Sequence, residues 1–151
     1  MEDWNQTTLG ELALTEENRL LGAAVRRMHG DTLLWAGTCP TTAELSRNCM
    51  IRSRLFACAG TCEASDDMSV FRSTLEEIPL RNGCIDGVVL HHALEQCADP
   101  RAALREVARV LQPGGQLILC GLQPLRQLVP RPLAALYTGS LSESLAYGGL
   151  A

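Results

Sequence analysis

The sequence predicts a three-layer α/β fold with a mostly parallel sheet of five strands. Short apolar runs bounded by turn residues recur along the chain, and a well-delimited amphipathic helix separates the last two runs. A strand, a helix and a second strand in succession give parallel pairing through a right-handed crossover, and helices then cover both faces of the sheet. The predicted strands cover residues 32–36, 54–58, 70–72, 85–90 and 116–120.

The segment 78–121 gives the strongest part of this prediction. Its first strand is apolar on both faces, which is typical of a parallel strand covered by helices. Asp99 and Pro100 then mark the start of a helix, as N-cap and first helical position. The apolar positions that follow form one stripe, and the Pro-Gly-Gly of residues 113–115 ends the helix. The pattern therefore specifies a strand–helix–strand unit.

The two ends of the chain carry weaker patterns. Residues 7–28 repeat apolar side chains at three- and four-residue steps, which predicts an N-terminal helix, and residues 41–48 predict a short one. After the fifth strand, residues 133–137 favour another short helix, and the Gly- and Ser-rich tail favours loose chain. We therefore predict one domain over residues 1–124 and a C-terminal extension over 125–151, without a terminal strand hairpin.

The fifth strand would then form a free sheet edge, which invites pairing with another chain. We expect this edge to be covered by the tail, or to pair with a second copy in a homodimer or with a partner subunit. Nucleic acid is not expected as a partner, because a net charge of -4 leaves no basic surplus to neutralise phosphates. No apolar stretch reaches the ~20 residues of a membrane helix, and the acidic N-terminus lacks a signal-peptide pattern. A cytoplasmic location is predicted.

The chain contains 7 cysteines. Their odd number and wide spacing argue against the disulfide framework of a secreted protein. A zinc site usually shows paired C-x-x-C knuckles or histidines at ligand spacing, and neither pattern occurs. We therefore predict no metal site and interpret the cysteines chiefly as small buried apolar residues, with metal or redox chemistry as the alternative.

Two long segments carry a resemblance to a known family. They are residues 78–95 (IPLRNGCIDGVVLHHALE) and residues 99–115 (DPRAALREVARVLQPGG). In this order they resemble the central segment of the class I S-adenosylmethionine (SAM) methyltransferases of the type 11 group. The resemblance implies a Rossmann-like sandwich with strand order 3-2-1-4-5, SAM as cofactor, and methyl transfer to an unidentified acceptor.

The resemblance also implies which residues contact the cofactor. They follow the first and third strands and end the fourth strand: Gly37, Thr38, Thr74, Leu75, Glu76, Leu90 and His91. His92 is the candidate for a general base on the acceptor, and the alternative is that it only begins the helix after the strand. Glu76 either reaches the cofactor or pairs with an arginine. Glu106, on the predicted helix, is expected to form a structural ion pair.

Three positions depart from the family's pattern. The loop after the first strand keeps only the first glycine, Gly37, of the family's Gly-x-Gly-x-Gly. The second strand ends at Cys58 without a carboxylate in register, and Thr74 stands where an aspartate is usual. The alternative function is therefore a catalytically inactive scaffold or interaction subunit. Because an active enzyme has to bind SAM, SAM binding distinguishes the two.

Overall fold

The computed structural model describes residues 8–37, 47, 49–60, 68–120, 136–140 and 143–147. The helices are α2 (Thr8–Arg26) and α3 (Pro100–Val110), and η2 (Leu94–Gln96) is a short 3-10 helix. The strands are β1 (Thr32–Gly37), β2 (Ser53–Cys58), β3 (Ser69–Arg72), β4 (Ile85–His91), β5 (Leu111–Cys120), β6 (Leu136–Ser140) and β7 (Glu143–Tyr147).

These strands form one sheet of 7 strands in the order β3-β2-β1-β4-β5-β6-β7. The pairs from β3 through β5 are all parallel. The predicted parallel sheet with strand order 3-2-1-4-5 is therefore confirmed, and β1 and β4 lie at its centre. The carboxyl ends of parallel strands share one edge of the sheet, and ligands bind at that edge in open α/β sheets.

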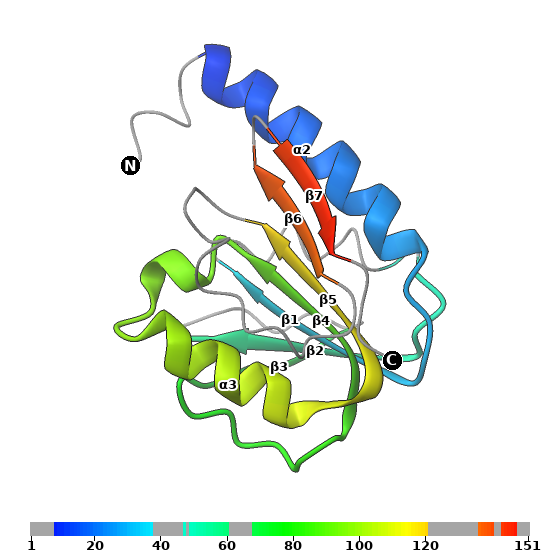
Figure 1. Ribbon diagram of the computed structural model, residues 1–151, viewed down its shortest axis with the longest axis vertical. Helices are drawn as coiled ribbons and strands as arrows, with labels where there is room; N and C mark the ends of the chain where they lie inside the picture. Colours follow the sequence, from blue (N-terminus) through cyan, green and yellow to red (C-terminus); the bar gives the residue numbers. More distant parts are fainter. Residues whose placement is uncertain are drawn as a thin grey trace.

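Helices cover both faces of this sheet (Figure 1), and the core consists of two clusters. Alternate residues of a strand point to opposite faces. In β1, Leu34 and Ala36 join the cluster under α3, whereas Leu33 and Trp35 join the cluster under α2. Trp35 is fully buried there. The three-layer arrangement expected from the sequence thus follows from strands that are apolar on both faces.

The chain after the fifth strand corrects the sequence prediction. β6 pairs with β5 in parallel and β7 pairs with β6 antiparallel, so a terminal strand hairpin is present. The predictions of no hairpin and of helical or loose chain at residues 136–140 and 143–147 were wrong. β6 also occupies the edge of β5 (Figure 1), which removes the reason for expecting a second subunit there. The predicted short helix at 41–48 lies almost wholly outside the described residues.

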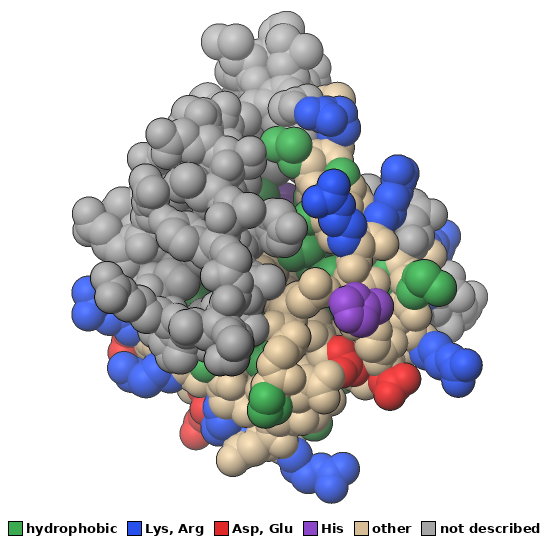
Figure 2. Space-filling view, turned by 45° about the vertical axis from the view of Figure 1, so that its right-hand side comes forward, with side chains coloured by type: hydrophobic (Ala, Val, Ile, Leu, Met, Phe, Trp, Pro, Cys, Tyr) green, Lys and Arg blue, Asp and Glu red, His purple; other side chains and the backbone are tan. Residues whose placement is uncertain are grey.

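Other sequence expectations have mixed outcomes. Cys58 is disulfide-bonded, so it is not the simple buried thiol we predicted, whereas Cys120 is buried and is not disulfide-bonded. The described arginines are exposed or half-buried, and Figure 2 shows several of them projecting from one face of the molecule. Within the described residues, no helix is long and apolar enough to cross a membrane.

Asp86 ties the amino ends of the central strands together. Its carboxylate oxygen Oδ2 accepts hydrogen bonds from the backbone N–H groups of Asp31 (2.7 Å), just before β1, and of Thr32 (2.9 Å), its first residue. Gly30 makes this turn with a φ of +132°, and a Cβ there would lie 2.5 Å from the Asp86 Cβ. Only glycine fits both demands. Asp86 therefore has a structural role at the end of the sheet opposite the ligand-binding edge.

We expect Asp86→Ala to lower the free energy of unfolding by about 2 kcal/mol, because it leaves two backbone donors without their charged acceptor. Urea denaturation measures the change. Asp86→Asn keeps the shape and one carbonyl acceptor, so its loss should be smaller. Equal stability of Asp86→Ala and the wild type would contradict this role.

Candidate functional site

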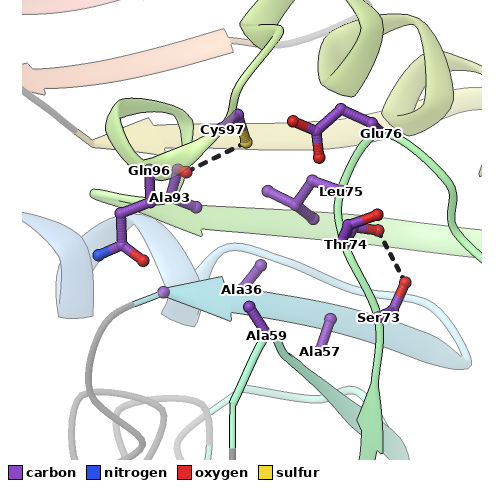
Figure 3. Close-up of a pocket in the computed structure, with 11 residues that line it drawn as sticks. Ala36, Ala57, Ala59, Ser73, Thr74, Leu75, Glu76, Ala93, Gln96 and Cys97 are labelled. Carbon is purple, nitrogen blue, oxygen red and sulfur yellow. Dashed lines mark hydrogen bonds between the residues drawn. The ribbon is translucent and has the colours of Figure 1, made fainter.

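The carboxyl ends of β1 and β2 line a cavity together with the segment after β3 and the turn of η2 (Figure 3). Its volume is about 100 Å³. This is the sheet edge at which open α/β folds bind ligands. The lining residues are Ala36, Gly37, Ala57, Ala59, Ser73, Thr74, Leu75, Glu76, Ala93, Gln96 and Cys97.

Small side chains form one side of the cavity. Ala36 and Gly37 end β1, and Ala57 and Ala59 lie at the end of β2, beside them in the register. Such residues let a ligand approach the backbone closely. Gly37 has an additional reason to be glycine, because a Cβ there would lie 2.7 Å from the backbone oxygen of His91 on β4. The absence of a side chain at Gly37 is thus required by the sheet itself.

The segment after β3 forms the opposite side of the cavity. Ser73 fixes it, since its hydroxyl donates to the backbone oxygens of Thr74 (2.7 Å) and Glu77 (3.0 Å). Its N–H donates to the Cys58 oxygen (2.9 Å), which joins the segment to β2. The resulting tight turn holds Thr74 and the largely buried Leu75 at the cavity. Both residues therefore line this cavity, and their contact with a cofactor stays a prediction.

Glu76 also lines the cavity, and its hydrogen bond described here is not to an arginine, whereas its predicted contact with the cofactor stays a prediction. Its Oε1 accepts a hydrogen bond from the backbone N–H of Asp99 (3.2 Å), just before α3. Burial, and secondly the charge of Glu76, raise the pKa of the neighbouring Cys97 thiol to about 11. Cys97 is therefore a neutral thiol near pH 7, and it donates to the Ala93 oxygen (3.3 Å; Figure 3). A nucleophilic role for Cys97 does not fit these surroundings.

The remaining predicted residues have different positions. Leu90 and His91 are both buried and are not among the lining residues, and Leu90 packs in the cluster under α3. Thr38 lies outside the described residues, as do the acidic residues 63, 66 and 67 that follow β2. Within the described part, β2 ends in Cys58, Ala59 and Gly60 and offers no carboxylate.

His92 adopts a backbone conformation that is rare for its type. Its φ is 51°, and among the described residues it is the one non-glycine with a positive φ. Its N–H donates to the Cys120 oxygen at the end of β5 (2.7 Å). Its ring nitrogen Nδ1 lies 3.1 Å from Oε1 of Glu95. The His92 ring is therefore held beside a carboxylate, and its role as a general base stays a prediction.

Sequence reasoning missed the small lining residues and the η2 residues. Ala36, Ala57 and Ala59 carry no functional group, and their only sequence signal is that small residues end two adjacent parallel strands. Gln96 and Cys97 are brought to the cavity by the short 3-10 turn after β4, which the sequence did not indicate.

A sequence model of the methyltransferase domain family matches residues 37–119, more than half of the 151-residue chain. The chain belongs to this methyltransferase domain family. The matched region begins at Gly37 and ends in β5. It thus contains the whole cavity except Ala36.

Relatives agree with this assignment. A demethylmenaquinone methyltransferase from Mycolicibacterium vanbaalenii is 30% identical over 122 residues, which cover 78% of this chain and 47% of that protein. The YcgJ protein of Bacillus subtilis superposes with a TM-score of 0.57 at 19% identity, covering 70% of this chain and 50% of that one. The chain thus spans about half the length of the curated relative.

The methyltransferase fold does not by itself fix the reaction. The [4+2]-cyclase SpnF superposes on this chain with a TM-score of 0.57 at 19% identity, covering 80% of this chain and 43% of SpnF. SpnF is named for a cyclisation. The function of this methyltransferase-family chain therefore has to be argued from its own site.

Proposed function

We propose that this domain uses S-adenosylmethionine to methylate an acceptor that is not yet identified. The observation that supports it is the cavity at the carboxyl ends of β1 and β2, closed by the segment after β3 and by η2. The family match includes almost all of its residues. SAM, when bound, supplies an electrophilic methyl group on a sulfonium, and positioning contributes most of the acceleration in such a displacement.

The described residues fit one part of the cofactor. At about 100 Å³ the cavity is smaller than a typical ligand pocket of ~300–1,000 Å³, so the described chain forms only part of the site. The small residues of β1 and β2 would admit a flat ring system close to the backbone. Thr74 and Gln96 would supply polar groups beside it, and Leu75 an apolar wall. Gly37 and Thr38 would begin the loop toward the methionine portion.

Binding of SAM tests the proposal, and Ala59 offers a clean variant. Ala59 is exposed at the rim, so Ala59→Leu fills the cavity without disturbing the core. We expect isothermal titration calorimetry to give micromolar binding for the wild type, about -8 kcal/mol, and weakening by about tenfold or more in Ala59→Leu. Gly60→Ala is the matched control, because a Cβ there meets nothing within 4 Å.

A second candidate function is a scaffold or interaction subunit without catalysis. Two observations favour it: β2 ends without a carboxylate within the described residues, and the Glu76 carboxylate already accepts from the Asp99 N–H. If millimolar SAM and S-adenosylhomocysteine give no heat of binding and no rise in melting temperature, the result would support the scaffold function and contradict the enzyme function. If SAM binds, the first acceptor to test is a demethylquinone, since the relative described above is named for one.

We also propose a cytoplasmic location. Four described cysteines form no disulfide, namely Cys49, Cys84, Cys97 and Cys120, which is typical of reducing compartments, and Cys58 is the exception. Cell fractionation that recovers the chain outside the cytoplasm would contradict the proposal.

A further inference from the structure

Three potential metal ligands meet where β4 and β5 end. His91 is the register partner of Cys120 across these strands. The next residue, His92, donates its N–H to the Cys120 oxygen (2.7 Å), which holds the two chain segments together. One ligand atom from each of the three side chains lies within 4.8 Å of the other two.

Strand alternation places His91 and Cys120 on the same face of the sheet. The preceding residues, Leu90 and Leu119, both belong to the cluster under α3. His91 and Cys120 therefore point to the α2 face, and both are buried, at 2% and 3% exposure. An imidazole and a thiol that pair across two strands are thus held side by side away from bulk water.

The unusual backbone of His92 brings a second imidazole to this pair. With a φ of 51°, its ring lies against that of His91, with the ring centroids 4.8 Å apart and the planes at 77°. Non-glycine residues in this region are strained, and such strain is concentrated at functional sites. In a regular strand, neighbouring side chains would point to opposite faces instead.

Glu95 orients the His92 ring as a metal ligand is usually oriented. Its two carboxylate oxygens lie 3.1 and 3.3 Å from Nδ1 of His92. Histidines that bind metals almost always donate their other ring N–H to a carboxylate, a carbonyl or water. With Nδ1 facing Glu95, Nε2 would be the nitrogen that binds an ion. The His92 side chain is 21% exposed, which provides an entry path from solvent.

We propose that His91, His92 and Cys120 form a binding site for one zinc-like divalent ion. Around Zn²⁺, with Zn–N of about 2.0–2.1 Å and Zn–S of about 2.3 Å, ligand atoms stand roughly 3.3–3.8 Å apart. The three ligand atoms now lie within 4.8 Å of one another. Side-chain rotations that move these atoms by about 1 Å would bring them to the spacing around Zn²⁺. Two imidazoles and a thiolate suit Zn²⁺ and Co²⁺ and exclude hard ions such as Mg²⁺. Binding displaces the Cys120 thiol proton to solvent.

This site is independent of the proposed methyl transfer. None of its three ligands lines the cavity described above. Sequence reasoning missed it because two ligands are adjacent and the third is far along the chain, so no spacing motif arises. Only the register of β4 with β5 brings them together.

Cobalt binding by the whole chain, purified with a chelator and kept anaerobic, tests the site. We expect one equivalent of Co²⁺ to give visible ligand-field bands and a near-ultraviolet thiolate-to-cobalt band, both displaced by Zn²⁺. Cys120→Ser should remove the thiolate band. Cys84→Ser is the matched control: Cys84 is also a free thiol, but it is exposed at the opposite end of β4, and its loss should leave the band unchanged.

Two further measurements keep the test decisive if Cys120→Ser is unstable. Glu95→Gln should weaken Zn²⁺ binding by about 10–100-fold while the thiolate band persists. His92→Gln should weaken Zn²⁺ binding and reduce the ligand-field intensity, with circular dichroism confirming the fold of each variant. A wild type that gives no thiolate band, or a band that Cys84→Ser removes, would overturn the proposal.

Discussion

Gly37→Val is expected to lower the free energy of unfolding by about 3 kcal/mol, at the upper end for overpacking a core. Gly37 ends β1 and is the register partner of His91 on β4, so the two central strands meet at this residue. A Cβ at Gly37 would lie 2.7 Å from the His91 oxygen and 3.2 Å from its Cβ. Because the first of these is a backbone atom, a rotamer change of a side chain cannot relieve the overlap, and β1 has to move. Urea denaturation followed by circular dichroism measures the loss.

Gly60→Ala is the control for Gly37→Val. It lies just after β2, and a Cβ there meets nothing within 4 Å, so the change should stay within about 0.5 kcal/mol. Equal stability of the wild type and Gly37→Val would mean that β1 and β4 are less closely packed than described. The same geometry affects the interpretation of binding: loss of SAM binding in Gly37→Val would report a damaged sheet. Ala59→Leu is the better probe, since Ala59 is exposed.

The sheet was predictable from sequence wherever local pattern and tertiary burial agree. β4 is apolar on both faces and α3 has a matching N-cap, with Asp99 accepting from the N–H groups of Arg101 and Ala102 (both 3.1 Å). These features require no knowledge of distant residues. The same agreement placed β1, β2 and β3 within one or two residues of their observed bounds.

The C-terminal hairpin was not predictable because its sequence signal is weak. β6 and β7 mix the strand formers Tyr and Thr with Gly, Ala and Glu, which are depleted in strands. Their pairing comes from the edge of β5, which offers backbone donors and acceptors to any extended chain. A tertiary contact thus decides the local structure. The beginning of β5 at Leu111, ahead of the predicted 116, has a similar cause, since Leu111 pairs with Ile85 across a register shift.

The candidate site was predictable to the extent that a motif marks it. Thr74, Leu75 and Glu76 follow a strand, as the family pattern indicated, and they line the cavity, while their predicted contact with the cofactor stays a prediction. Leu90 and His91 lie at the correct strand end, but strand alternation directs Leu90 into the core and His91 toward the α2 face. A sequence pattern identifies the end of a strand more easily than the direction of each side chain there.

Arg109→Met is expected to cause the other large loss of stability, measured as a fall in the urea midpoint. The Arg109 guanidinium donates to the backbone oxygens of Ile78 (2.7 Å) and Leu80 (2.8 Å) and to Asn82 Oδ1 (2.8 Å). It also makes a two-pronged ion pair with Glu106, with two contacts of 2.8 Å. Glu106 in turn accepts from the Ile78 N–H (2.9 Å). The Arg109 side chain thus links the segment before β4 to α3. The predicted structural ion pair of Glu106 is confirmed.

Methionine keeps the apolar stem of Arg109 and removes only its donors, so the variant separates hydrogen bonding from packing. Arg105→Met is the control, because Arg105 is exposed one helical turn earlier on α3, and its replacement should stay within about 0.5 kcal/mol. Equal midpoints for Arg109→Met and Arg105→Met would contradict the assignment of this network as the link between the segment and the helix.

The acid response provides a second readout of the same network. The hydrogen bond from Arg109, followed by that from the Ile78 N–H, lowers the pKa of Glu106 from 4.5 to about 2. A carboxyl whose pKa is lower in the folded state stabilises the fold above its unfolded pKa and loses that contribution as the pH falls through the folded pKa. The difference in unfolding free energy between the wild type and Glu106→Gln should therefore be constant near neutral pH. It should shrink as the pH falls from 4.5 toward about 2. Urea midpoints at neutral pH and at about pH 3 measure it, and a difference that stayed constant would show that Glu106 is not held ionised by Arg109.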